Sequence, residues 1–242
     1  MSETGYGSEQ FLRVCDVALA CREIDGRGPY AALGRLRAGS WELTRYGRRL
    51  PAVTVRLSGS PAGRMIGEHL AIREQGRRRY RYRDAQGVLS LPSDFAQYLR
   101  GRHRQAVRTN VGHARRAGFT AARTELEGWE PGLDDTRRGF LSPGPVELWK
   151  VRGPDGEGPA LAEAIVTVDD DVALLHGLGS SARYARWLLH TEIVERLCGS
   201  CGVLLVNSDD AYLLGPGHRY FQRLLGYEIA RLQVPRLTLD AA

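Results

Sequence analysis

The sequence predicts an α/β (α+β) protein: a central mixed, mostly antiparallel sheet flanked by helices, with a smaller N-terminal α/β segment. Three observations predict it. Ala160–Val168 and Val172–Gly179 are two apolar runs around an Asp-Asp-Asp turn, which indicates a hairpin. GLGSSARYARWLLHTEIVERL, residues 177–197, has a strand end, a turn and an amphipathic helix. VLLVN, Val203–Asn207, then has the unbroken apolar run of a buried parallel strand.

We expect two units, a small N-terminal α/β lobe over residues 1–90 and a main domain over 91–242. In the first, PAVTVRL (Pro51–Leu57) alternates and is rich in valine, which predicts a strand. The weaker candidates are a helix or strand at Phe11–Ala20 and strands at Met65–Ile72 and Val88–Leu91. In the second unit the same signals predict strands at Phe119–Thr124 and Val146–Val151, a short helix RYFQRLL and a last strand YEIARLQV.

A long helix is predicted at the start of the second unit, capped by Ser93 and running to about Ala117, with Gly118 as its stop. Its apolar arc consists of Phe95, Leu99, Ala106, Val107, Val111 and Ala114, with His103 and Asn110 inside it. Arg104, Arg108 and Arg115 flank this arc, whereas Arg102 and Arg116 face water. The flanking arginines either bind a ligand or extend their stems along the apolar face.

Composition indicates a globular protein with no membrane span, which we expect in the cytoplasm. Of 242 residues, 43% are hydrophobic, the start MSETGYGSEQ is polar, and no apolar run is long enough to cross a bilayer. The net charge of +6 and pI near 9.4 favour phosphate-rich partners. Lys150 is the only lysine among 34 basic residues, so the arginine excess also fits a GC-rich coding sequence.

The four cysteines predict reduced thiols rather than a disulfide framework. Cys198-Gly-Ser-Cys201 has the spacing of a zinc or redox pair, but the chain offers no matching second pair, since Cys15 and Cys21 are too far apart in sequence. The alternative is that these thiols are small apolar side chains at a helix end. We therefore expect no metal.

The segment REQGRRRYRYRD alternates arginines with rings in its second half, at Arg79, Tyr80, Arg81, Tyr82 and Arg83. On a strand, this pattern puts guanidinium groups on one face and rings on the other, which suits single-stranded nucleic acid. A solvated edge strand protected by its charges is the alternative.

The order hairpin, helix, parallel strand, short helix ending in Leu-Gly-aromatic, and closing strand resembles the second half of the GNAT acyltransferase fold. The turn in YFQRLLGYE, residues 220–228, is similar to that family's helix-to-strand ending. RGRHRQAVRTNVGHARRAGFT resembles the Arg/Asn-rich helix of the Fem-like, aminoacyl-tRNA-dependent branch. The resemblance covers about residues 93–238 and leaves residues 1–90 unmatched.

Two departures from the GNAT pattern argue against an acyl-CoA donor. The pyrophosphate turn of the family falls on Ser180-Ser181-Ala-Arg183-Tyr-Ala185, where an arginine replaces a glycine. At the position of the family's proton-donating tyrosine stands Gln222, which has no proton to give. The resemblance therefore implies no tightly bound cofactor and aminoacyl-tRNA as the donor substrate, with acyl-CoA as the alternative.

Either donor implies attack by an amine on an activated carbonyl, with an oxyanion held by backbone N–H groups near Leu175 to Leu178. His176 is the candidate proton acceptor, unless it is a core or edge residue. Asn207, Asp209 and Asp210 follow the buried strand, as an ammonium-holding group or as an ordinary Asx-rich turn. The expected donor-binding residues are Ser180, Ser181, Arg183, Gln222, Arg104 and Arg108.

These features predict an acyltransferase that forms an amide bond by transferring an aminoacyl group from tRNA to an amine, in peptide natural-product (antibiotic) or cell-wall synthesis. Two alternatives stay open. One is an acyl-CoA-dependent GNAT N-acetyltransferase, and the other is a non-catalytic, RNA-binding GNAT-like module.

Overall fold

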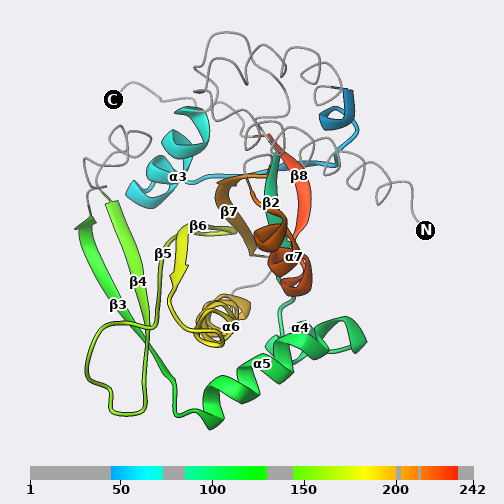
Figure 1. The fold of residues 1–242 in the computed structure, drawn as a ribbon. Coiled ribbons are helices and arrows are strands. Elements are labelled where there is room, and N and C mark those ends of the chain that lie inside the picture. Colours follow the sequence, from blue (N-terminus) through cyan, green and yellow to red (C-terminus); the bar gives the residue numbers. More distant parts are fainter. Residues whose placement is uncertain (1–44, 73–84, 130–143, 200–202, 212–213, 234–242) are drawn as a thin grey trace, which may run out of the picture.

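The computed structural model describes residues 45–72, 85–129, 144–199, 203–211 and 214–233 (Figure 1). This part of the chain builds one eight-stranded sheet in the order β1-β8-β2-β7-β6-β5-β4-β3, in which only β1/β8 and β6/β7 pair in parallel. The strands are β1 (Ala52–Thr54), β2 (Ala85–Ser90), β3 (Thr120–Trp129), β4 (Gly144–Arg152), β5 (Ala162–Asp169), β6 (Val172–Ser180), β7 (Leu204–Asp210) and β8 (Glu228–Gln233).

Helices cover both faces of the sheet. They are α3 (Pro61–Ile72), α4 (Phe95–Tyr98), the 3₁₀ turn η2 (Arg102–Arg104), α5 (Gln105–Arg116), α6 (Ala185–Cys198) and α7 (Pro216–Leu225). Along β6, Ala173 and Leu175 are buried with α6, whereas Val172 and Leu174 are buried with α3, because successive side chains of a strand point to opposite faces. Figure 1 shows α3 on one side of the sheet and α6 on the other, with α5 outside α6.

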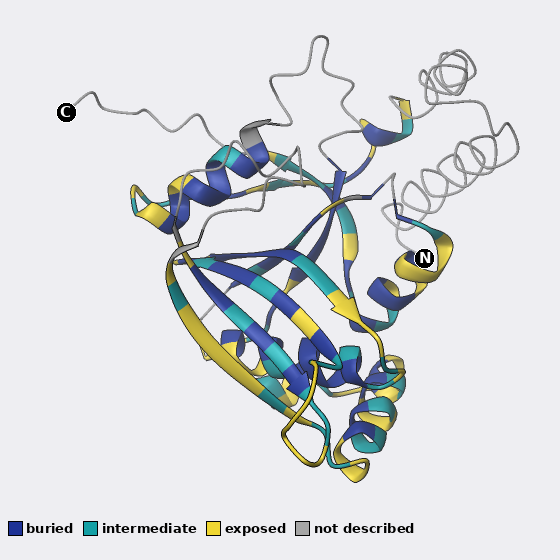
Figure 2. Ribbon diagram, turned by 60° about the vertical axis from the view of Figure 1, so that its left-hand side comes forward, coloured by how far each residue is buried: buried dark blue, intermediate teal, exposed yellow. Residues whose placement is uncertain are grey.

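The predicted fold class is therefore confirmed, and so is the order of elements that resembles the GNAT fold. The hairpin β5/β6, the parallel pair β6/β7 and the intervening α6 lie where the sequence placed them. Gly226 ends α7 in the left-handed region at φ 87°, which is why a glycine stands in the Leu-Gly-Tyr turn. Figure 2 shows the central strands largely buried and β3, at the sheet edge, largely exposed.

Two predicted elements are wrong. Met65–Ile72 is not a strand but the last two thirds of α3, which Ser60 caps by accepting the N–H of Gly63 at 2.9 Å. Its buried residues Met65, Ile66 and Leu70 follow helical spacing, and a short apolar run alone does not separate this pattern from a strand.

The long helix predicted over 93–117 is broken. Asp94, not Ser93, caps α4, and the chain leaves helical geometry at Gly101, with φ 88°, before η2 and α5. Arg108 donates through Nη1 to the carbonyls of Leu99 and Gly101. These bonds satisfy carbonyl groups that the break leaves without helical partners.

The division expected at residue 90 does not separate two sheets. β1 and β2, both from residues 1–90, pair with β8, and β2 also pairs with β7 near the middle of the sheet. Five of the six residues of β2 are buried, so this strand belongs to the main core. Residues 1–44 and 73–84 lie outside the described part, and the small lobe over residues 1–90 stays a prediction.

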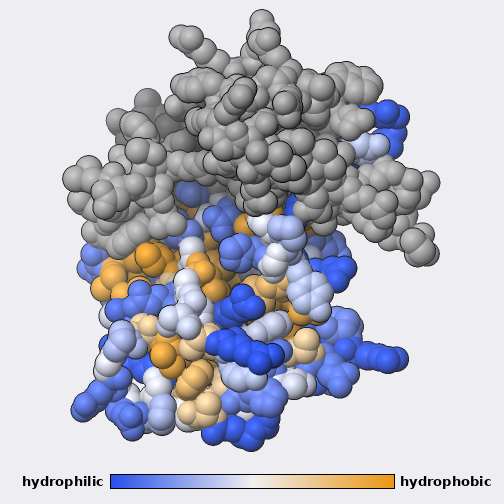
Figure 3. Space-filling model, in the orientation of Figure 1, coloured by the Kyte–Doolittle hydropathy of each residue, from blue (hydrophilic) through white to orange (hydrophobic). Residues whose placement is uncertain are grey.

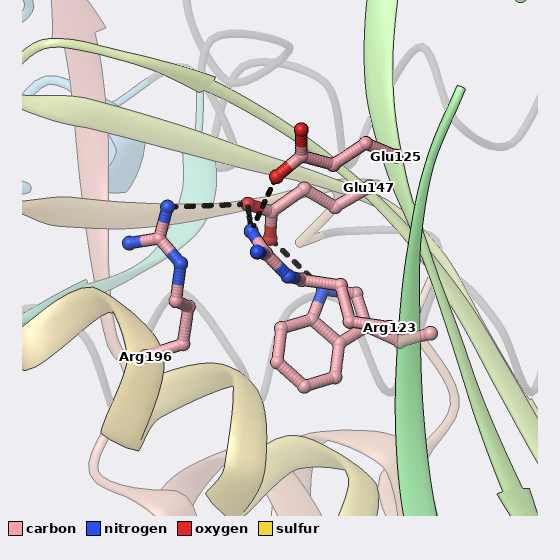
Figure 4. Close-up of polar contacts among 5 residues, drawn as sticks. Arg123, Glu125, Glu147 and Arg196 are labelled. Atoms are coloured by element: carbon pink, nitrogen blue, oxygen red, sulfur yellow. Dashed lines mark hydrogen bonds and ion pairs between the residues drawn. The ribbon is translucent and has the colours of Figure 1, made fainter.

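A buried carboxylate ties α6 to the outer strands (Figure 4). Glu147 on β4 is 8% exposed, and its Oε1 lies 2.7 Å from Nη1 of Arg123 on β3 and 3.5 Å from Nη2 of Arg196 on α6. Its Oε2 accepts the indole N–H of Trp149 at 3.0 Å. With two cations and one N–H donor around it, the charge of Glu147 is compensated in spite of its burial.

Replacing Glu147 by Gln is expected to lower the free energy of unfolding by about 1–2 kcal/mol, because two guanidinium groups lose their charged partner in a partly desolvated place. Urea denaturation measures this change. Glu163→Gln is the matched control, since Glu163 pairs with Lys150 at the surface and such pairs contribute about 0.5 kcal/mol or less. Equal losses in the two variants would show that the burial of Glu147 carries no extra stability.

Candidate functional site

The site is organised by the separation of two parallel strands. β6 and β7 pair only from Val172↔Leu204 to Leu175↔Asn207. β6 then continues to Ser180 against β5, whereas β7 continues against β2. Beyond the last pair, the facing edges of the two strands have lost their ladder partners, and a separated edge of this kind presents backbone groups to a ligand.

A pocket of about 210 Å³ lies at this separation, between the start of α6 and the inner face of α7. Its walls combine apolar side chains with a larger number of polar ones. The apolar part consists of Leu175, Leu178, Leu214, Phe221 and Leu225, and the polar part of Ser180, Arg186, His190, Asn207, Asp209, His218, Gln222 and Tyr227.

A buried histidine–tyrosine pair forms part of this lining. Nε2 of His190 lies 2.9 Å from the hydroxyl of Tyr227, and the two residues are 1% and 8% exposed. Burial, followed by the positive charge of Arg104, lowers the pKa of His190 to about 3, so its imidazole is neutral at pH 7. Burial, followed by the neighbouring Tyr98, raises the pKa of Tyr227 well above its usual value. The phenol therefore keeps its proton and is a hydrogen-bond donor at neutral pH.

Arg186 supplies a positive charge to the pocket. It lies in the first turn of α6, with its guanidinium carbon 4.5 Å from the centre of the Phe221 ring. Its Nε is buried and has no hydrogen-bond partner among the described residues. A ligand with an acceptor oxygen at this wall would satisfy that nitrogen.

Asn207 and Asp209 are brought into the pocket together, from the end of β7. Oδ1 of Asn207 accepts the backbone N–H of Asp209 at 2.9 Å, which is the Asx turn that the sequence left open as an alternative. The Asx turn is thus observed, the exposed carboxylate of Asp209 remains available to a cation, and the ammonium-holding role of these residues stays a prediction. The side chain of Asp210 lies outside the described residues.

His176, the predicted proton acceptor, lies on the opposite face of the sheet and is not part of the pocket lining. It is 0% exposed, its Nε2 lies 2.7 Å from Oγ1 of Thr167, and its ring meets that of His69 on α3. Ordinary alternation along β6 places it there, since Leu174, two residues earlier, also faces α3. A β-bulge follows, in which Leu175 and Gly177 face successive residues of β5 and His176 is the extra residue. The bulge reverses the alternation beyond His176, so that Leu178 reaches the pocket wall.

Of the three residues predicted to bind the donor in the turn before α6, only Ser180 lines the pocket. Ser180 lines the pocket, but its hydroxyl donates to the carbonyl of Ala182 at 2.8 Å, and the N–H of Ser181 donates to the carbonyl of Leu161 at 2.9 Å. Ser181 and Arg183 are exposed outside the lining, and the Arg183 guanidinium carbon lies 5.3 Å from the ring of Tyr184. The turn is thus held by its own bonds, without the glycine backbone of a pyrophosphate cradle.

Gln222 lines the pocket as predicted, whereas Arg104 and Arg108 do not. Arg104 is 9% exposed, donates through Nη1 to the carbonyl of Leu224 at 3.2 Å and stacks over Tyr98. A side chain at Gly226 would overlap its guanidinium group. Both side chains hold main-chain carbonyls, Arg104 in a buried place and Arg108 at the surface, and their binding of the donor stays a prediction.

Several predicted residues cannot be placed. Arg79, Tyr80, Arg81, Tyr82 and Arg83 lie outside the described residues, as does Cys201. Cys198 is a buried free thiol, and burial raises its pKa to about 11. Within the described ranges, no three His, Cys, Asp or Glu side chains are placed to hold a metal ion, and no helix is long and apolar enough to cross a membrane.

Sequence reasoning missed Arg186, His190 and Tyr227. Arg186 and His190 are four residues apart, so they share one face of α6. A polar pair at this spacing in a mostly buried helix was the available signal. Tyr227 was read only as part of the Leu-Gly-Tyr turn, and its neighbour across the pocket was not visible in the sequence.

Neither a family model nor a curated protein matches this sequence. Among solved structures, the C-terminal domain of a protein assigned as a lysylphosphatidylglycerol synthetase from Agrobacterium fabrum matches with a TM-score of 0.42 and 14% identity, over 60% of this chain and 57% of that one. L-PGS from Bacillus licheniformis matches with a TM-score of 0.41 and 8% identity, over 60% and 57%.

A conserved protein of unknown function from Bacteroides thetaiotaomicron matches with a TM-score of 0.42 and 13% identity, over 59% of this chain and 55% of that one. This chain thus spans somewhat more than half the length of each. Likenesses of this size do not determine what the chain does.

Proposed function

We propose that this chain is a Fem-like acyltransferase that moves an aminoacyl group from aminoacyl-tRNA to an amine, forming an amide bond in the pocket between β6 and β7. The observation that carries the proposal is the strand separation after Leu175↔Asn207, with a tyrosine hydroxyl and a carboxylate in the pocket that it opens. Peptide natural-product or cell-wall synthesis is the setting that this chemistry suits.

The pocket offers a group for each step of the transfer. The amine nitrogen attacks the ester carbonyl, and backbone N–H groups of β6 near Leu178, where the strand no longer pairs with β7, can receive the oxyanion. The C–N bond forms, the ester C–O bond breaks, and the departing ribose oxygen needs a proton. Tyr227, protonated at neutral pH, can donate to that oxygen, and Asp209 can hold the incoming amine and accept its proton.

The turn before α6 favours tRNA over acyl-CoA as the donor. The hydroxyls of Ser180 and Ser181 and the N–H of Ser181 are directed to main-chain carbonyls of the protein. Arg183 stands where a glycine would let a pyrophosphate approach the backbone. An aminoacyl ester carried on the terminal adenosine of tRNA does not need a pyrophosphate-binding turn.

The donor is tested by incubating the full chain with tRNA carrying a labelled amino acid, or with labelled acetyl-CoA, in the presence of a pool of small amines and peptides. Phosphatidylglycerol vesicles form a second acceptor arm, because two of the matched structures bear the name lysylphosphatidylglycerol synthetase. We expect label to move from tRNA to an amine. Transfer from acetyl-CoA alone would establish the acyl-CoA alternative, and RNA binding without any product would establish a binding module.

The role assigned to the Asp209 carboxylate, which is to hold the amine acceptor, gives a separate prediction. Asp209→Asn is expected to raise the KM for the amine acceptor about tenfold, with less effect on the KM for the donor, because it removes a charge-assisted contact to the ammonium. Asp155→Asn, in an exposed turn away from the pocket, is the control. An unchanged acceptor KM in Asp209→Asn would mean that the carboxylate does not hold the amine.

A further inference from the structure

Residues 95–124, which form α4, η2, α5 and the start of β3, contain no aspartate or glutamate. Their arginines are not equivalent in the structure. Arg104 is buried against α7, and Arg115 pairs with Glu192 on α6 at 3.1 Å. The others on these helices are exposed, and none of them forms an ion pair in the described structure: Arg100, Arg102, Arg108 and Arg116. Figure 3 shows strongly hydrophilic residues over α4 and the start of α5, at the lower right.

This surface continues onto both helices that line the pocket. At the end of α5, His113 stacks on Tyr184 with ring centres 5.0 Å apart, next to the exposed Arg183. At the start of α5, Arg104 reaches the last turn of α7, which carries the exposed Arg223. We call Arg100, Arg102, Arg108, Arg116, Arg183 and Arg223 the arginine face.

An aromatic ring belongs to this face. Tyr220 on α7 is 55% exposed, and the guanidinium carbon of Arg223 lies 5.3 Å from the centre of its ring. No other large hydrophobic side chain is exposed in the described part of the chain. A surface that inserts into a lipid headgroup layer needs several exposed apolar side chains, and this face offers a single phenol.

We propose that the arginine face is a docking surface for RNA, and, resting on the proposed function, that it holds the RNA body of the donor while the pocket takes its acylated end. α5 has 12 residues and is about 18 Å long, which spans several phosphates of a nucleic-acid backbone. Arginine pairs with phosphate oxygens through two N–H groups, and the exposed ring of Tyr220 can stack an unpaired base.

The test compares two triple variants of the full chain that remove the same charge. The face variant is Arg102→Gln, Arg116→Gln and Arg223→Gln. The control variant, Arg48→Gln, Arg49→Gln and Arg56→Gln, changes three exposed arginines near β1. The probe is fluorescently labelled, deacylated bacterial tRNA, titrated between about 50 and 200 mM salt. All six positions are exposed, so thermal melting should be the same in the three proteins.

We expect the face variant to bind tRNA at least tenfold more weakly, with the slope of log K against log salt reduced by about two to three, and the control variant to lose less than threefold. Equal losses in both variants, or no tRNA binding by the unchanged protein, would overturn the proposal. So would a face-dependent binding to phosphatidylglycerol vesicles in place of tRNA.

Deacylated tRNA has no group to transfer, so this measurement is independent of catalysis. If aminoacyl transfer occurs and the face variant binds tRNA normally, the docking surface is wrong and the proposed function stands. If the face binds tRNA and no donor yields a product, the surface stands and the transferase proposal fails.

Discussion

Tyr227→Phe is expected to lower kcat for aminoacyl transfer about 100-fold while leaving the KM of both substrates within threefold. The change removes one hydroxyl that faces the pocket, and loss of a single hydrogen-bond donor at a developing oxyanion or leaving group typically has an effect of this size. The hydroxyl gives the pocket an O–H proton donor, which the amide of Gln222 cannot replace. Steady-state kinetics with the donor that supports transfer measures the effect.

Tyr220→Phe is the matched control, because it removes a phenol hydroxyl at an exposed position outside the pocket and keeps the ring that belongs to the arginine face. Its kcat should stay within twofold. A purely structural role of Tyr227 predicts a lower melting temperature with normal kcat below it, since His190 would lose its partner. That outcome, or equal kcat values in the two variants, would contradict the assignment of Tyr227 as the proton donor.

The second large effect is a loss of stability at low pH that is caused by His190. The pKa of His190 is about 3 in the folded protein, and an unfolded histidine has a pKa near 6.5. Above pH 6.5 both states are neutral, and the full stability is present. Between pH 6.5 and 3 only the unfolded state takes up the proton, so the free energy of unfolding falls by about 1.4 kcal/mol per pH unit, or about 2 kcal/mol by pH 5.

Urea denaturation of the unchanged protein and of His190→Gln between pH 7.5 and 5 measures this contribution. Gln cannot become charged, so the variant should lose about 2 kcal/mol less than the unchanged protein over this range. His103→Gln, at an exposed position, should keep the dependence of the unchanged protein. If His190→Gln keeps it as well, the imidazole is not held neutral by its burial.

Local signals were sufficient for most of the fold. The β5/β6 hairpin, α6, the parallel strand β7 and the Gly226 turn are each fixed by residues close in sequence, and each is confirmed. The break at Gly101 was missed because the helical spacing continues on both sides of it. The carbonyl groups at that break are satisfied by Arg108, a contact that no periodicity reveals.

In the candidate site, too, some residues could be predicted from the sequence and others could not. By itself, the sequence determined that Ser180, Asn207 and Asp209 lie at the ends of strands and that Gln222 lies on the short helix that follows. Only the tertiary structure decided that His176 faces α3, that Arg104 packs on Gly226, and that Tyr227 meets His190 in the pocket. Which face of β6 carries the pocket depends on how the helices pack on the sheet, and burial against those helices sets which polar groups reach the pocket and which protons they keep.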